Sequence, residues 1–240
     1  MYNQRVSPPP ISSITQANSQ ASTIFLAKVF NWMAIGLALT GVTAFITVNS
    51  PTLLRAIFGN KMVFYGLMFA ELGMVFYLSA RIQKMSAQAA TGLFAAYSIL
   101  NGITLSAILL VYTTTSVAAT FFITAGMFGT MSVYGFVTKK DLTSMGSFLF
   151  MGLIGMIIAS VINIFLASSM MSWVISAIGV IVFTGLTAYD VQKVTRIGAS
   201  GIMEQGEATI RKTAIIGALA LYLDFINLFI SLLQFTGNRR

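Results

Sequence analysis

The sequence predicts an all-α integral membrane protein, a bundle of seven transmembrane helices. Two observations support this fold class. Of the 240 residues, 57% are hydrophobic and only 8% are charged, whereas roughly a quarter of the residues in a soluble domain are charged. The apolar residues also form continuous runs, and a helix needs about 20 such residues to cross a bilayer.

In chain order, a polar tail at 1–24 comes first. It is rich in Pro, Ser, Thr and Gln, it lacks the pattern of a cleavable signal peptide, and we expect it to be disordered. Seven predicted helices and a short basic tail follow, at 25–48, 62–80, 87–111, 117–137, 144–166, 172–191, 213–236 and 237–240. The runs lack the alternation of barrel strands, and a helix satisfies its own backbone in lipid.

Basic residues between the spans predict the orientation. Ten of the 14 lysines and arginines fall on the side of the N-terminal tail, and four fall on the other side. Because cytoplasmic loops carry the basic excess, we expect a cytoplasmic N-terminus and a C-terminus on the periplasmic side. If the last stretch re-enters the membrane instead of crossing it, both termini are cytoplasmic. The net charge of +8 then reflects topology and does not indicate nucleic-acid binding.

Two residue types are missing from the composition. The chain has no Cys and no His, which excludes disulfides, thiol nucleophiles, Ser-His dyads and His-ligated metals. We therefore expect no enzymatic activity, no cofactor and no permanently bound metal.

Three acidic residues lie within or at the edge of predicted spans: Glu71, Asp190 and Asp224. An acid at the centre of a spanning helix costs roughly 2.5–3.5 kcal/mol on insertion scales, so each is a candidate functional residue. Asp224 is deepest, and it belongs to a small and polar face of the last span, where residues recur every three or four positions. The members of that face are Gly217, Ala220, Asp224, Asn227, Ser231 and Gln234.

That face predicts a polar surface turned to the protein interior. Asn227, Ser231 and Gln234, together with Glu71 in the second span, are candidates for lining an ion pathway. Asn101 and Asn163 fit interhelical hydrogen bonding better than ligand binding.

Asp190 and Asp224 lie on consecutive helices and invite pairing. Two carboxylates in contact cannot both ionise cheaply, so such a pair would titrate as a unit and act as a proton switch. On the predicted bounds, however, Asp224 lies about 10–15 Å deeper than Asp190. Pairing therefore requires that the sixth helix continue past Lys193 or that residues 206–213 lie at the membrane surface.

Arg81, at the end of the second span, has two open roles. It is placed to close the inner mouth by pairing with an ionised Asp190. It is equally placed to anchor the helix end at the membrane surface.

Four segments resemble the signature of the transmembrane Bax inhibitor motif family, also called Bax inhibitor-1-like. They are Asn101-Gly102-Ile103-Thr104-Leu105-Ser106, then 119–125, then Thr187-Ala188-Tyr189-Asp190-Val191-Gln192, and finally 221–229. The resemblance spans residues 25–236 and suggests a bacterial member.

The resemblance implies a seven-helix bundle with the last helix at the centre, and a pH-sensitive calcium leak. By motif, the two aspartates of its sensor fall on Asp190 and Asp224, and an arginine that latches the closed state falls on Arg81. The loop at 192–212 is longer than the resemblance implies.

The leading hypothesis is therefore a pH-sensitive calcium leak channel or transporter of the bacterial inner membrane, with transient binding of Ca²⁺ or H⁺ at Asp190 and Asp224. Its expected partners are membrane lipid and these ions. Two alternatives stay open. One is a non-conducting modulator of stress survival or of a membrane-bound protease. The other is an intramembrane aspartyl protease, although the Gly-x-Gly-Asp and Pro-Ala-Leu elements of such enzymes are missing.

Overall fold

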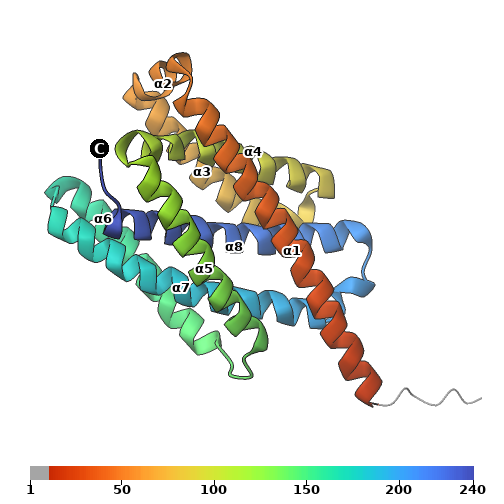
Figure 1. Cartoon of the computed structure of the whole chain (residues 1–240). Coiled ribbons are helices and arrows are strands. Elements are labelled where there is room, and N and C mark those ends of the chain that lie inside the picture. The colour runs from red at the N-terminus through yellow and green to blue at the C-terminus, as the bar shows by residue number, and fades with distance from the viewer. Residues whose placement is uncertain (1–10) are drawn as a thin grey trace, which may run out of the picture.

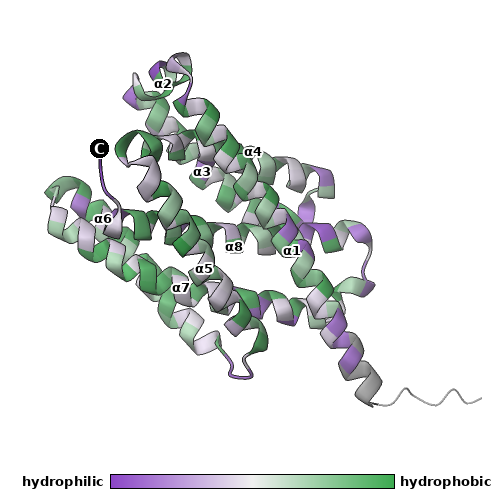
Figure 2. Ribbon diagram, in the orientation of Figure 1, coloured by the Kyte–Doolittle hydropathy of each residue, from purple (hydrophilic) through white to green (hydrophobic). Residues whose placement is uncertain are grey.

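The computed structural model describes residues 11–240. In that part of the chain seven helices are long and apolar enough to cross a membrane, which confirms the predicted fold class. These are α1 (Ile11–Val48), α3 (Lys61–Arg81), α4 (Ala87–Val111), α5 (Thr114–Val137), α6 (Thr143–Leu166), α7 (Ser169–Ala199) and α8 (Glu207–Thr236). Figure 2 shows hydrophobic residues along the long helices and hydrophilic residues gathered at the loops and bundle ends.

Helix α8 lies at the centre of the bundle, as the family resemblance implies. In its most apolar stretch 72% of the residues are buried inside the protein, against 6–33% in the other six spans. It packs against α1, α4, α5 and α7, and Figure 1 shows it crossing the bundle behind α1 and α5. Asp224 and Ser231 on α8 are therefore surrounded by protein.

Short capped connections join the helices. Side chains of Ser50, Asn60, Ser86, Thr113 and Ser168 each accept a hydrogen bond from a backbone N–H in the first turn of the helix that follows. The short helix α2 (Pro51–Phe58) and the 3₁₀ turns η1 (Ile82–Lys84) and η2 (Ile202–Glu204) complete the chain path. The sequence prediction missed α2, although Ser50 followed by proline at the first helical position is a recognised helix start.

The polar N-terminal segment is the first correction. Residues 11–24, expected to be disordered, are helical and continue into the membrane-spanning part of α1, while residues 1–10 lie outside the described part of the chain. The last of these turns packs against α7, where a Cβ at Gly198 would meet the Cα of Ser22 at 2.6 Å. Because this contact is tertiary, composition alone did not reveal it.

The connection between α7 and α8 is the second correction. Helix α7 continues to Ala199 and α8 begins at Glu207, so the long loop predicted from the sequence is mostly helical. The side-chain amide of Gln192 supports this extension: its Oε1 accepts from Leu142 N at 2.9 Å and its Nε2 donates to Lys140 O at 2.8 Å. These bonds tie the end of α7 to the loop between α5 and α6.

Candidate functional site

Asp190 and Asp224 meet at the interface between α7 and α8. Their side chains are neighbours, with the carboxyl groups within reach of a hydrogen bond, so the structure brings together the two aspartates that the sequence predicts as a pair. Asp224 is buried, with 4% of its surface exposed, whereas Asp190 is half-buried. A direct contact between two carboxyl groups requires a proton on one of them, because an ionised carboxylate only accepts hydrogen bonds.

Helix lengths explain how the two aspartates reach each other. Because α7 extends six residues beyond Lys193, Asp190 lies nine residues, or about 14 Å, inside the end of the helix. Helix α8 begins six residues before the predicted bound at 213 and crosses α7 at an angle (Figure 1). The first of the two alternatives that pairing required, continuation of α7 past Lys193, is therefore present.

Few other polar or charged groups contact the pair formed by Asp190 and Asp224. Within residues 11–240, Oδ2 of Asp224 is buried and has no hydrogen-bond donor. The cation whose charge acts on Asp190 is Lys193, one turn further along α7. Neither aspartate belongs to an ion pair in the described part of the chain, where the two salt bridges are Arg196–Asp141 at 2.7 Å and Arg211–Glu207 at 3.0 Å.

Arg81 does not latch onto Asp190 in this structure. It ends α3 as an exposed residue and, among the described residues, forms no ion pair with Asp190. Helix α3 packs on α4 and α2. The predicted contact is absent because α3 lies at the outside of the bundle, away from the interface between α7 and α8.

The polar face of α8 turns toward α7, as predicted, but its residues pack there. Gln234 Oε1 accepts from Ser176 Oγ at 3.0 Å. Ser231 is buried against Gly179, where a Cβ would meet the serine oxygen at 2.4 Å. Asn227 donates to the carbonyl of Leu223 in its own helix at 2.8 Å. In this conformation Ser231 and Gln234 contact α7, whereas the bond made by Asn227 stays within α8.

Glu71 takes part in a different polar cluster, between α3 and α4. Its Oε1 accepts from Thr104 Oγ1 at 2.7 Å and its Oε2 accepts from Asn101 Nδ2 at 3.4 Å. The prediction that Glu71 faces the bundle is confirmed by these contacts, and so is the prediction that Asn101 forms interhelical hydrogen bonds.

Tyr222 continues this cluster into the bundle centre, and the sequence analysis missed its role. Its hydroxyl donates to Asn101 Oδ1 at 3.0 Å and lies 2.7 Å from Thr40 Oγ1. The chain Glu71–Asn101–Tyr222–Thr40 therefore links α3, α4, α8 and α1. Residues two positions apart on a helix point in directions about 200° apart around its axis. Tyr222 and Asp224 therefore leave α8 on nearly opposite sides.

The arrangement suits proton binding and weak cation binding. With one proton the pair forms a hydrogen bond, and with none its oxygens attract hard cations. Two carboxyl groups supply fewer ligands than the six to eight oxygens that Ca²⁺ takes. Residues 11–240 also contain no group of three or more acidic residues placed to hold a metal ion.

Comparisons with known proteins agree with the fold and the motifs. The family model described as "Inhibitor of apoptosis-promoting Bax1" matches residues 23–240. The inner membrane protein YbhL of Escherichia coli K12 is 49% identical over 232 residues, which cover 97% of this chain and 98% of that protein.

Two further relatives come from other bacteria. A protein of Borreliella burgdorferi is 48% identical, covering 90% of this chain and 92% of its own length. A membrane protein of Streptococcus pyogenes serotype M1 is 38% identical, covering 89% of this chain and 92% of its own length. The chain therefore belongs to the Bax inhibitor-1-like family and is a multi-pass membrane protein.

Proposed function

We propose that the protein is a pH-sensitive cation leak, with Ca²⁺ as its cation, and that Asp190 and Asp224 form its proton sensor. The observation that carries this proposal is the direct contact of two carboxyl groups between membrane-spanning helices. Placing a carboxyl group inside a membrane bundle costs free energy, and helices can pack without one. In a chain without histidine, such a pair is the group best suited to respond to protons.

The proposed mechanism uses the charge of the pair. One shared proton joins the two carboxyl groups and holds α7 against α8. Loss of that proton leaves two negative charges in contact, and like charges at this separation repel strongly in a water-poor interior. Separation of α7 from α8 relieves the repulsion and exposes carboxylate oxygens to cations.

The structure is consistent with a closed form of such a leak. Ser231 packs against Gly179 of α7, and Gln234 accepts a hydrogen bond from Ser176 of α7. In the described part of the chain, three buried side-chain oxygens lack partners: Ser132 Oγ on α5, Thr184 Oγ1 on α7 and Asp224 Oδ2 on α8. Water or a cation entering between these three helices would satisfy them.

Ion flux across vesicles of purified protein tests the proposal. We expect Ca²⁺ release whose rate depends on pH across roughly pH 6 to 8, and we expect the dependence to change in Asp190→Asn and Asp224→Asn because an amide pair has no proton to lose. Asp141→Asn is the matched control, since this exposed acid lies in a loop. Identical flux in the wild type, both variants and protein-free vesicles would reject the leak.

A further inference from the structure

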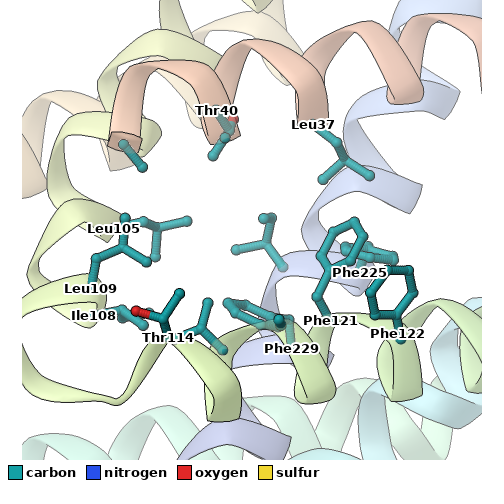
Figure 3. Close-up of a pocket in the computed structure, with 15 residues that line it drawn as sticks. Leu37, Thr40, Leu105, Ile108, Leu109, Thr114, Phe121, Phe122, Phe225 and Phe229 are labelled. Carbon is teal, nitrogen blue, oxygen red and sulfur yellow. The ribbon is translucent and has the colours of Figure 1, made fainter. Parts of the chain in front are cut away.

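An apolar pocket opens between α1 and α4 on one side and α5 on the other. Its volume is about 320 Å³, within the range of small-molecule sites. Its walls include Leu37, Gly41, Leu105 and Phe122, and its floor is formed by Phe225 and Phe229 of α8 (Figure 3). The pocket exists because α5 packs on α7 and α8 and does not close against α1.

The pocket runs from a lipid-facing rim to a buried floor. At the rim Phe122 is 72% exposed, whereas Phe229 on α8 is 9% exposed. Helices α1, α4 and α5 are membrane spans, so the medium at this rim is the bilayer. The hydroxyl of Thr40 in the wall is already in contact with Tyr222, so the pocket offers little to a polar ligand.

The dimensions of the pocket fit one acyl chain. Along α5 its lining extends from Thr114, the first residue of the helix, to Phe122. These eight residue steps correspond to about 12 Å. The hydrocarbon of one leaflet is half of a core about 30 Å thick, or about 15 Å. The pocket therefore covers most of the depth of one leaflet.

Two arginines, Arg239 and Arg240, lie near one end of the pocket, the end lined by Thr114. Arg240 Nη2 donates to Thr114 Oγ1 at 3.3 Å, and Arg240 N donates to Val111 O at 2.9 Å. The guanidinium of Arg239 lies 5.8 Å from the centre of the Tyr112 ring. Both arginines are exposed. A cationic group at a membrane surface attracts anionic lipid headgroups.

We propose that the pocket binds one acyl chain of an anionic membrane phospholipid, with the lipid phosphate held by Arg239 and Arg240. The apolar walls select the chain, the depth matches one leaflet, and the arginines supply charge complementary to the phosphate. This site is distinct from the aspartate pair, and the inference does not depend on the proposed leak. It places a lipid against α8, the central helix, on the face that also carries Tyr222.

Photolabelling in vesicles tests this site. Purified full-length protein is placed in phosphatidylcholine vesicles with a trace of phosphatidylglycerol that carries a diazirine near the end of one acyl chain. After illumination, adducts are mapped by mass spectrometry. We expect adducts on residues 225–229 of α8, which lipids around the outside of the bundle do not reach because Phe225, Ile226 and Phe229 are buried.

Two variants make the test specific. A Cβ at Gly41 meets no atom within 4 Å and Gly41 lines the pocket, so the side chain of Gly41→Leu takes up pocket volume and should lower labelling of 225–229 by about tenfold. Gly126→Leu is the matched control: Gly126 is equally open but does not line the pocket, and labelling should stay at the wild-type level. A thermal unfolding curve confirms that both variants fold.

The headgroup is tested separately. Labelling by a phosphatidylcholine probe with the same acyl chain should be weaker than labelling by the phosphatidylglycerol probe. The double variant Arg239→Gln with Arg240→Gln should remove this preference for phosphatidylglycerol, and each arginine should account for a roughly fivefold difference in labelling. Adducts confined to outward-facing residues, equal labelling by the two probes, or unchanged labelling in Gly41→Leu would each overturn the proposal. A cross-linked dimer in place of lipid adducts would also overturn it, because a second copy would then occupy the pocket.

Discussion

Replacement of Tyr222 by phenylalanine should destabilise the bundle by removing one hydroxyl from the centre of its polar cluster. Tyr222 has no exposed surface. Its hydroxyl donates to Asn101 Oδ1 at 3.0 Å and lies 2.7 Å from Thr40 Oγ1. The substitution leaves the ring in place, so its edge-to-face contact with Phe94 is retained. The effect measured is therefore that of the hydroxyl alone.

The expected cost follows from the two contacts. A buried hydrogen bond contributes about 0.5–1.5 kcal/mol, so two contribute about 1–3 kcal/mol. Interhelical hydrogen bonds in membrane proteins average about 0.6 kcal/mol each, which favours the lower half of this range. We therefore expect Tyr222→Phe to lower the free energy of unfolding by about 1–2 kcal/mol.

Unfolding by SDS in mixed micelles, followed by circular dichroism, measures this difference. Tyr97→Phe is the matched control, because Tyr97 is also buried and packs edge-to-face on Tyr222, yet its hydroxyl forms no hydrogen bond with residues 11–240. The control should stay within about 0.5 kcal/mol of the wild type. Equal effects of the two substitutions, or no effect of Tyr222→Phe, would refute the assigned hydrogen bonds.

Two further predictions concern the packing of α7 against α5 and the loop between α5 and α6. A Cβ at Gly135 would meet the carbonyl oxygen of Ala188 at 2.3 Å, so Gly135→Ala should cost about 1–3 kcal/mol in the same unfolding assay, whereas Gly129→Ala, which meets no atom within 4 Å, should be tolerated. Hydrogen bonds from Thr143, with Arg196 nearby, lower the pKa of Asp141 from 3.8 to about 2. This stabilisation is present above about pH 4 and is lost as pH falls toward 2, so Asp141→Asn should be less stable than the wild type above about pH 4 and should converge with it near pH 2. A difference of the same size at both pH values would contradict this assignment.

The fold class was accessible from sequence because lipid imposes a strong constraint. Continuous apolar runs located all seven spans, and their bounds were wrong mainly where polar residues continue a helix beyond the membrane. The turns after Lys193 and the turns at 11–24 are examples. Polarity ends an apolar run, but it does not end a helix whose polar turns pack against other helices.

The candidate site could be predicted from the sequence only in part. Asp190 and Asp224 stood out because an acid in a span is rare, and spacing alone assigned the face of α8 to which Asp224 belongs. Of the two roles open for Arg81, the pairing with Asp190 is absent among the described residues, and a position at a helix end says nothing about which helices are neighbours. Tyr222 gave no signal in the sequence, since its role depends on Thr40 and Asn101 from two other helices.

The most direct test of the account is the separation of the Asp190 and Asp224 carboxyl groups in experimental structures determined near pH 6 and pH 8 in lipid. The shared-proton mechanism predicts contact at the lower pH, with α7 against α8, and a wider separation with the interface open at the higher pH. An unchanged separation at both pH values, or aspartates that never touch, would contradict it.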